Sequence, residues 1–417
     1  MRVLLIHQNF PGQFKHLGPA LVARGDHVVA LTPKVKERTE WRGITVEPYA
    51  IKRGNGQNVH PWVTDFETKV IRAEACYNGA VALKQSGFEP DVILTHHGWG
   101  ESLFLKDVWP NARMGLYCEL YHLADYPFVG FDPEFDQGLN DTDPMRLRLR
   151  NINNDMHFDI ADAGLSPTQF QADTFPATFR DKIRVIHDGI DTDFVCPDPN
   201  AALTVSPDLT LTRNDEVITF INRNLEPYRG YHIFMRALPR MLVERPNAHI
   251  VILGGDDVSY GARPPKGKTW KQIFIDEVRG SISDADWARV HFMGRVPYAT
   301  FLSMIRVSRV HVYLTYPFVL SWSLLETMSA GAAIVACSTD PVTEVMEDGK
   351  TGLLVNFFDP DEIVDRVHEL MHDTALRQTL GQAAPQKWSK ITICEASACP
   401  VCWTGWTRSR SISVVIA

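Results

Sequence analysis

The sequence lacks any apolar run close to the roughly 18 residues that a membrane-spanning helix needs, although 45% of its 417 residues are hydrophobic. Met1–Ile6 is apolar but runs directly into a polar loop, so it is too short for a signal peptide and predicts a buried first strand. We therefore expect no transmembrane segment and a cytoplasmic setting. A peripheral contact with a membrane is left open.

Basic charge is scarce as well. The 42 Lys and Arg residues are outnumbered by 50 Asp and Glu residues, and the formal net charge is −8. Because nucleic-acid-binding proteins usually present basic surfaces, this balance argues against a nucleic-acid partner. Arg146, Arg148 and Arg150 alternate with leucines in the helix-like run Met145–Phe158. We interpret them as a solvated helix face rather than a membrane-surface patch, since acidic residues flank the run.

Cysteine and cofactor signatures are also sparse. Seven cysteines, an odd number, in a long chain favour reduced thiols. The first strand–loop–helix run has no G-x-G-x-x-G, so a nicotinamide cofactor is not supported. No D-x-D element is placed to hold a metal, and we expect neither a metal nor another cofactor. Cys399-Pro400-Val401-Cys402 has the spacing of half a zinc site, but no second ligand pair lies nearby.

Strand-like and helix-like runs alternate in both halves of the chain, which predicts an α/β protein with two doubly wound, Rossmann-like domains facing across a cleft. The stretch from Cys196 to Asn214 contains three prolines and no clear periodicity, so it is interpreted as a linker. The expected organisation is an N-terminal domain over residues 1–196, a linker over 197–213, a C-terminal domain over 214–388 and an atypical tail over 389–417.

Two arginines follow the first strand of the second half. Arg223 and Arg229 lie in Ile221–Gly230, a loop between a strand-like and a helix-like run. Such loops lie at the carboxyl edge of a parallel sheet, where open α/β folds bind ligands. Arginine offers a planar fork of donors to phosphate oxygens, and a helix N-terminus adds partial positive charge. The pattern favours a diphosphate clamp, and two solvated loop arginines are the alternative.

A second loop of the same kind is Tyr316–Gly331. Its carboxylate, Glu326, is suited to accept hydrogen bonds from a ribose diol, since one carboxylate accepts two hydroxyls at once. The hydroxyls of Ser321 and Ser323 would meet phosphates at the helix start. The alternative is structural: Ser323-x-x-Glu326 fits a capping box, in which Glu326 binds the start of its own helix.

Polar residues also follow strand-like runs in the first half. Gly12 stands at a helix start where a ligand could approach the backbone, or else it is a turn glycine. His97 and Glu119 come after two further strands, and they could bond to sugar hydroxyls. A satisfied structural role is the alternative for both.

Four motifs, by their order and spacing along the chain, together resemble the pattern of family 4 retaining glycosyltransferases, which have the GT-B fold. The motifs are Arg223 with Arg229-Gly230, His187-Asp188-Gly189-Ile190-Asp191, Gly294-Arg295-Val296-Pro297, and Leu325-Glu326-x-x-Ser329-Ala330-Gly331. The resemblance spans roughly residues 1–385.

The resemblance implies transfer of a sugar from a nucleoside-diphosphate sugar to an acceptor hydroxyl, with retention at the anomeric carbon and no metal. Arg223 and Arg229 would hold the diphosphate, Glu326 the ribose, and the backbone near Arg295 the base. Gly12 would lie against the diphosphate, and the acceptor, a carbohydrate or another hydroxyl compound, would sit on the first domain.

The chain departs from that pattern in three places. Phe318 and Glu119 occupy positions where the family usually has a glutamate and a histidine. Ile391–Ala417 shows no sustained helical period, and we interpret this segment as a replaced or frame-shifted end without a site of its own. Two alternative functions follow: a sugar-nucleotide 2-epimerase on the same fold, and a non-catalytic sugar-nucleotide-binding subunit.

Overall fold

The computed structural model describes residues 1–135 and 140–389. The chain divides into two compact units. The first is built from Met1–Tyr126 and Leu139–Gly189, and the second from Pro127–Gly138 and Ile190–Thr392. The two Rossmann-like α/β units expected from the alternation are therefore confirmed. The expected tail falls almost wholly outside the described residues, and so do its three cysteines.

The first unit contains an eight-stranded sheet in the order β3-β4-β2-β1-β5-β6-β7-β8. All neighbouring strands pair parallel except β3 and β4, which pair antiparallel. The strands are β1 (Arg2–Ile6), β2 (His27–Thr32), β3 (Thr39–Trp41), β4 (Ile44–Pro48), β5 (Val92–Thr95), β6 (Arg113–Tyr117), β7 (Ala163–Ser166) and β8 (Ile183–Val185).

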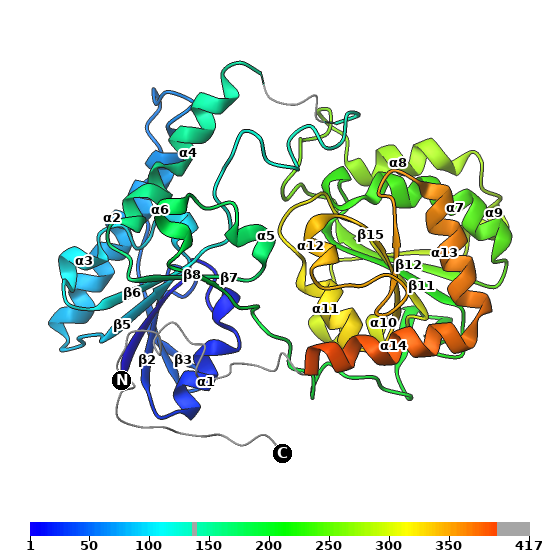
Figure 1. Cartoon of the computed structure of the whole chain (residues 1–417), viewed down its shortest axis with the longest axis horizontal. Coiled ribbons are helices and arrows are strands. Elements are labelled where there is room, and N and C mark those ends of the chain that lie inside the picture. The colour runs from blue at the N-terminus through cyan, green and yellow to red at the C-terminus, as the bar shows by residue number, and fades with distance from the viewer. Residues whose placement is uncertain (136–139, 390–417) are drawn as a thin grey trace. The chain divides into compact units, whose positions relative to one another are not determined.

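Helices connect these strands and flank the sheet (Figure 1). They are η1 (Gly12–Phe14), α1 (Leu17–Ala23), α2 (Thr64–Gln85), η2 (His97–Trp99), α3 (Leu105–Val108), α4 (Asp143–Phe158), α5 (Gln169–Ala172) and α6 (Ala177–Arg180). Strand β1 shows why the sheet forms here: Val3, Leu4, Leu5 and Ile6 are all fully buried, as expected of a central parallel strand covered on both faces. Arg146, Arg148 and Arg150 of α4 are exposed, as expected of a solvated face.

The second unit contains a six-stranded, fully parallel sheet in the order β13-β12-β11-β14-β15-β16. The strands are β11 (Val217–Asn224), β12 (His249–Gly255), β13 (Val290–Gly294), β14 (Val310–Tyr313), β15 (Ala333–Cys337) and β16 (Leu353–Val355). Strands β11 and β14 are neighbours in the middle of the sheet. The chain places β12 and β13 on one side of β11 and β15 and β16 on the other side of β14, so the strand order reverses between β11 and β14. Such a switch point is where open α/β sheets bind ligands.

Helices lie on both faces of this sheet (Figure 1). They are η3 (Pro227–Arg229), α7 (Tyr231–Glu244), α8 (Trp270–Arg279), α9 (Asp284–Trp287), α10 (Tyr298–Val307), α11 (Trp322–Ser329), α12 (Asp340–Thr343), α13 (Pro360–His372) and α14 (Thr374–Ser389). The buried side chains of the sheet and of the faces of α7, α10, α11 and α13 that cover it form one continuous apolar core.

The stretch expected as a linker, residues 197–213, contains regular secondary structure. It contains an antiparallel hairpin of β9 (Ala202–Ser206) and β10 (Leu209–Thr212). Leu203 and Leu211 are buried in the core of the second unit. The apolar alternation of these short strands was hidden by the neighbouring prolines, so composition alone suggested a loop.

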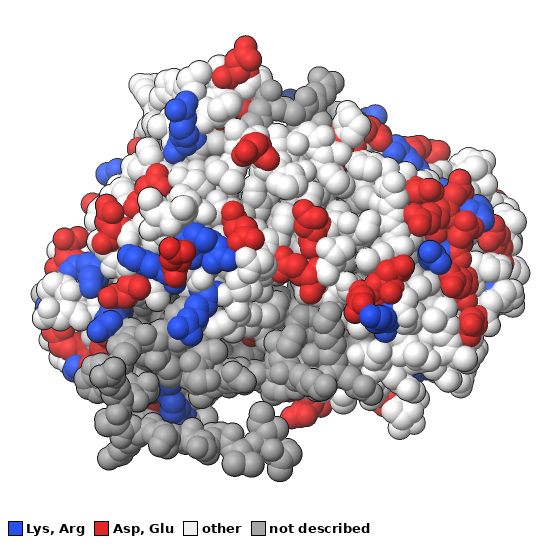
Figure 2. Space-filling model, in the orientation of Figure 1, with Lys and Arg blue, Asp and Glu red and all other residues white. Residues whose placement is uncertain are grey.

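In the described ranges, no helix combines the length and the apolar character needed to cross a membrane. On the face shown in Figure 2, Lys and Arg side chains are interspersed among more numerous Asp and Glu side chains. That face therefore has no continuous basic area of the kind that nucleic acid requires.

Candidate functional site

Four loops meet at the carboxyl edge of the six-stranded sheet, after β11, β12, β13 and β14, which are consecutive neighbours in the sheet. Parallel strands bring such loops together, and this edge is the usual binding edge of an open α/β sheet. The six residues expected from the second half lie at the ends of these strands, on the loops, or on α11 after β14: Arg223, Arg229, Arg295, Ser321, Ser323 and Glu326.

Arg223 is the last residue but one of β11, and its side chain is exposed. Within the described part of the chain, its guanidinium makes no hydrogen bond and no ion pair. A guanidinium held at a sheet edge by a rigid strand, with its donors unused, is available to bind an anion.

Arg229 ends the short helix η3 and is only 6% exposed. Its Nη1 donates to the Thr315 hydroxyl at 2.7 Å and to the Val319 carbonyl at 3.0 Å. The guanidinium also lies over the rings of Tyr260, at 5.1 Å, and Phe318, at 5.8 Å. The loops after β11, β12 and β14 thus all contribute to the place where this charge is held.

Arg229 has no carboxylate partner among the described residues, which is unusual for a buried charge. By contrast, Arg236 on the next helix binds both Glu134 and Glu277. Burying a charge without a counter-ion is costly, and native proteins normally pair it. Arg229 and Arg223 are therefore two guanidinium groups at this edge without a carboxylate partner among the described residues, and such groups can bind an anionic ligand.

Phe318 stands where the resemblance led us to expect an acid, and its ring belongs to an aromatic cluster. It lies edge-on to Tyr228 at 5.1 Å and to Phe128 at 5.6 Å, and its centroid is 5.1 Å from that of Tyr260. An apolar ring beside Arg229 provides a cation–π contact and no charge neutralisation. The substitution thus preserves the local positive charge.

Helix α11 begins at Trp322, and Ser321 is its N-cap. The Ser321 hydroxyl accepts the Ser323 N–H at 3.3 Å and lies 2.9 Å from the Ser323 hydroxyl. The alternative interpretation of Ser323 and Glu326 as a capping box is therefore wrong, because the N-cap is Ser321, two residues earlier than that pattern requires. The partial positive charge of the helix start lies at the same edge as the arginines.

Glu326 is 7% exposed, and its Oε1 accepts the Tyr298 hydroxyl at 2.6 Å. Tyr298 begins α10 after β13, so this bond joins two of the edge loops. Burial and the bond to Glu326 raise the pKa of Tyr298, which keeps its hydroxyl a donor. Glu326 thus already acts as a hydroxyl acceptor, the chemistry expected for binding a ribose.

Arg295 follows β13, and its Nη2 donates to Asn224 Oδ1 at 3.0 Å and to Asp257 Oδ2 at 2.7 Å. Its side chain therefore bridges the loops after β11 and β12. Gly255 makes room for it, because a Cβ there would lie 2.5 Å from Arg295 Nε. This bridge shapes the part of the edge that was expected to receive a base.

Sequence reasoning missed Glu226, which lies between the two arginines. Its buried carboxylate accepts the backbone N–H groups of Ser259, Tyr260 and Gly261 at 3.0 to 3.3 Å. The bonds fasten the loop after β12, which carries Tyr260 over Arg229. The signal in the sequence was an acidic residue three positions after Arg223, but its partners lie more than thirty residues away.

In the first unit, Gly12 begins η1 with a positive φ of 47°. A Cβ at this position would lie 2.3 Å from the His7 ring. His7 is held by its neighbours: its Nδ1 accepts the Asn9 N–H at 2.9 Å, and its Nε2 donates to Gln13 Oε1 at 2.6 Å. The turn and the His7 ring therefore account for this glycine, and an approach of ligand to its backbone stays a prediction.

His97 was expected at a sugar-side surface, and the structure contradicts this. Its side chain is 1% exposed, and its Nδ1 donates to the Tyr117 carbonyl at 3.0 Å. Burial and the nearby His157 lower the pKa of His97 well below its usual value. The residue is a neutral core histidine, because the chain enters the short helix η2 at this point and turns the side chain inward.

His96, one position earlier, lies beside Glu119, with 3.5 Å between His96 Nε2 and Glu119 Oε2. His7 contacts His96 edge-on, with ring centroids 5.3 Å apart. Burial opposes protonation of His96, but the hydrogen bond and charge of Glu119 outweigh it, and the pKa of His96 is raised. The three residues follow β1, β5 and β6, so polar groups do come together at these strand ends, with His7 and His96 in place of His97.

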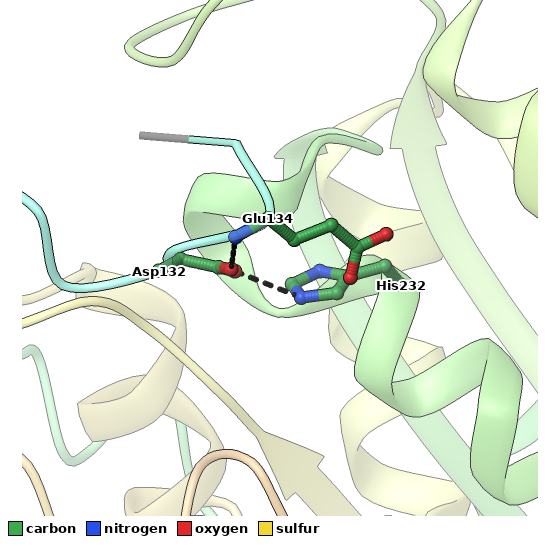
Figure 3. Close-up of side chains that lie close together, drawn as sticks. All are labelled: Asp132, Glu134 and His232. Atoms are coloured by element: carbon green, nitrogen blue, oxygen red, sulfur yellow. Dashed lines mark hydrogen bonds and ion pairs between the residues drawn. The ribbon is translucent and has the colours of Figure 1, made fainter. Parts of the chain in front are cut away.

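One group of described residues has the composition of a metal site: Asp132, Glu134 and His232 bring potential ligand atoms within 4.8 Å of one another (Figure 3). Glu134 is already bound by Arg236 through two bonds of 2.7 Å. A guanidinium this close opposes a second cation electrostatically. The geometry therefore fits an internal polar network better than a metal centre.

Comparisons with known proteins agree with this architecture. A family model described as "Glycosyl transferase family 4 group" matches residues 24–195, and one described as "Glycosyl transferases group 1" matches residues 206–387. A D-inositol 3-phosphate glycosyltransferase of Corynebacterium jeikeium is 27% identical over 50% of this chain and 48% of its own length. A phosphatidyl-myo-inositol mannosyltransferase of Mycolicibacterium smegmatis is 28% identical over 40% of this chain and 38% of its own length. The chain thus spans half or less of the length of these curated relatives.

Solved structures share the fold over almost the whole chain. Sucrose-phosphate synthase from Thermosynechococcus elongatus has a TM-score of 0.71 at 17% identity, covering 95% of this chain and 96% of its own. The Anabaena protein HepE, solved with UDP and glucose, has a TM-score of 0.63 at 16% identity, covering 94% and 96% of the two chains. Two adjoining family models that run from residue 24 to residue 387, together with this shared fold, show that the chain belongs to the family 4 glycosyltransferases of the GT-B fold.

Proposed function

We propose that the protein transfers a sugar from a nucleoside-diphosphate sugar to an acceptor hydroxyl, with retention at the anomeric carbon and without a metal. The observation that carries this proposal is the buried Arg229, which has no carboxylate partner among the described residues, together with the exposed Arg223 at the same edge of the sheet. A diphosphate would supply the missing negative charge. The helix start at Ser321 would add its partial positive charge to the binding of the same anion.

The donor's other parts are assigned by chemistry. The ribose diol would bond to Glu326, either beside or in place of the Tyr298 hydroxyl that Glu326 now accepts. The base would lie near the Arg295 bridge. We propose UDP as the first nucleotide to test, because HepE was solved with UDP and a related Escherichia coli structure with UDP-2-fluoro glucose. Inositol compounds are the first acceptors to test, in view of the names of the curated relatives.

The proposed step is a substitution at the anomeric carbon. The acceptor oxygen forms a bond to this carbon, while the bond from the carbon to the β-phosphate oxygen breaks and its electron pair stays on the phosphate. The acceptor's proton passes to a leaving phosphate oxygen, so no enzyme base is needed. Arg223, Arg229 and the helix start would stabilise the negative charge that grows on the leaving group.

A binding screen with UDP, GDP, dTDP and ADP tests the first part of the proposal. A nucleotide present at a hundred times its Kd should stabilise the fold by about 2.7 kcal/mol, which a thermal-shift assay detects. If none of the four shifts the transition, the proposed site is refuted.

The second test is Arg223→Ala. Loss of one preorganised donor typically lowers kcat by roughly a hundredfold, or about 3 kcal/mol. Arg279→Ala is a control: it removes a partly buried arginine that pairs with Asp284, away from the carboxyl edge, and should leave turnover unchanged. Near-normal kcat in a folded Arg223→Ala protein would refute the clamp.

Two further measurements separate the alternatives. Incubation with donor alone, followed by NMR of the product, would reveal an epimerase, whereas the names of the relatives favour transfer. Tight nucleotide binding without transfer to any acceptor or hydrolysis of the donor would indicate a non-catalytic binding subunit.

The stereochemistry and the metal independence of the proposed transfer have tests of their own. The anomeric configuration of the product reports retention, and turnover that persists in EDTA reports metal independence.

A further inference from the structure

A segment from the first half of the chain is part of the second unit. This strap, Pro127–Phe135, leaves the first unit after Tyr126 and lies against the second unit. Its three phenylalanines are its apolar anchors. They contact rings of the second unit as follows: Phe128 contacts Tyr228 and Phe318, Phe131 contacts Tyr316 and Phe357, and Phe135 contacts Trp270 and Phe274.

Asp132 is the charged centre of the strap and is only 2% exposed. Its Oδ2 accepts the Tyr316 hydroxyl at 2.8 Å and lies 3.0 Å from His232 Nε2. Its Oδ1 accepts the backbone N–H of Glu134 at 3.1 Å. Figure 3 shows the carboxylate between this N–H and the His232 ring. A carboxylate buried this deeply is tolerated because both of its oxygens are engaged.

The two side chains that Asp132 joins belong to the segments after β11 and β14, which also hold Arg229: His232 lies in α7, and Tyr316 lies in the loop after β14. His232 lies in the first turn of α7, three residues after Arg229. Tyr316 is adjacent to Thr315, whose hydroxyl accepts from Arg229. In addition, the Tyr316 N–H donates to the Tyr228 carbonyl at 3.1 Å. Asp132 therefore connects the segments after β11 and β14, and Arg229 connects the same two segments through its bond to Thr315.

We propose that Asp132 is a positioning residue for the phosphate-binding arginine. It fixes the start of α7 and the loop after β14 relative to each other, and thereby sets the position of the Arg229 guanidinium. This inference rests on the proposed function, because it assumes that Arg229 meets a diphosphate. It gives the strap a role in ligand binding beyond connecting two parts of the chain. A loop shift of a fraction of an ångström would weaken a bidentate phosphate contact while leaving the fold intact.

The test measures Kd for UDP and for uridine, or for the diphosphate and nucleoside of whichever nucleotide the screen selects. Asp132→Ala should weaken diphosphate binding by roughly tenfold to a hundredfold and leave nucleoside binding unchanged. Asp132→Asn should restore most of the affinity, because its amide oxygen still accepts the Tyr316 hydroxyl. Glu134→Gln is the matched control on the same strap: it removes the exposed pair with Arg236 and should bind like wild type.

Tyr316→Phe keeps the proposal testable if Asp132→Ala does not fold, since it removes one hydroxyl and preserves the ring packing. It should weaken diphosphate binding selectively and in the same direction. In an Arg229→Ala background, Asp132→Ala or Tyr316→Phe should have no further effect on diphosphate affinity, because the arginine that Asp132 and Tyr316 position is gone.

The outcomes separate the two ideas. Failure of the wild-type protein to bind any nucleoside diphosphate would refute the proposed function. Normal binding by Asp132→Ala and Tyr316→Phe, in a protein that Arg223→Ala weakens, would overturn the positioning role alone. Thermal stabilisation of the wild type by Zn²⁺, lost in Asp132→Ala, would also overturn it and identify the cluster as a metal site.

Discussion

Two arginines that look equivalent in the sequence have different surroundings. Arg223 is exposed and has no partner within the described residues, whereas Arg229 is buried beneath Tyr260 and Phe318. Arg223 can act on a ligand without affecting the fold. Arg229 stabilises the fold in addition to its proposed role in diphosphate binding, because its donors also bond to the Thr315 hydroxyl and the Val319 carbonyl.

This difference predicts the stability of the two alanine variants. Arg229→Ala leaves the Thr315 hydroxyl and the Val319 carbonyl without their donor, and it should lower the free energy of unfolding by about 1–3 kcal/mol. Arg223→Ala should change it by less than about 0.5 kcal/mol. Urea denaturation of both variants measures the difference. Equal stabilities would show that Arg229 is not held as the structure describes.

Gly12 makes a second prediction at this scale. Gly12→Ala combines a left-handed φ with a Cβ 2.3 Å from the His7 ring, and should destabilise the first unit by roughly 1–3 kcal/mol. Gly54→Ala is the control, since nothing lies within 4 Å of a Cβ at Gly54. A shift in the histidine NMR signals of Gly12→Ala would locate the disturbance at His7. A Gly12→Ala protein as stable as Gly54→Ala would contradict this packing.

At the scale of elements, strand ends were predicted well and helix starts less well. The loops after β5, β6, β11 and β14 carry the polar residues that the sequence suggested. Yet the chain turns into η2 directly after β5, so His96 and not His97 meets Glu119. Likewise α11 begins at Trp322, so Ser321 is the cap. One residue of shift changes which side chain faces the site, because successive side chains point in different directions.

The cap assignment is testable. Ser321→Ala removes the side-chain acceptor of the Ser323 N–H and should cost about 1 kcal/mol of stability. Ser323→Ala leaves that acceptor in place and should cost less. Thermal or urea unfolding of the two variants without ligand decides the matter. The reverse order would restore the capping box centred on Ser323.

At the scale of the whole molecule, buried histidines predict sensitivity to acid. Burial lowers the pKa of His7 and His157 to about 4 and that of His311 to about 3. Below pH about 6.5 the unfolded chain binds protons at these sites and the folded chain does not. The free energy of unfolding is therefore unaffected by these histidines above that pH, and it decreases as the pH falls toward 4. His96 has a raised pKa and acts in the opposite sense.

Between the unfolded and the folded pKa, each such histidine should lower the free energy of unfolding by roughly 1.4 kcal/mol per pH unit. Urea midpoints measured at pH 7.5, 6.0 and 5.0 should fall progressively. A midpoint that stays constant or rises over this range would show that the buried histidines are protonated in the folded protein.

The sequence by itself determined the two α/β units, the strand ends that carry polar groups and the family. These features are encoded locally, by apolar periodicity and by short motifs that need no knowledge of distant residues. Only the tertiary structure decided that Arg229 is buried, that His96 replaces His97, and that Asp132 of the strap joins Tyr316 and His232. Those facts depend on contacts between residues far apart in the chain, such as Asp132 and Tyr316, and local periodicity carries no record of them.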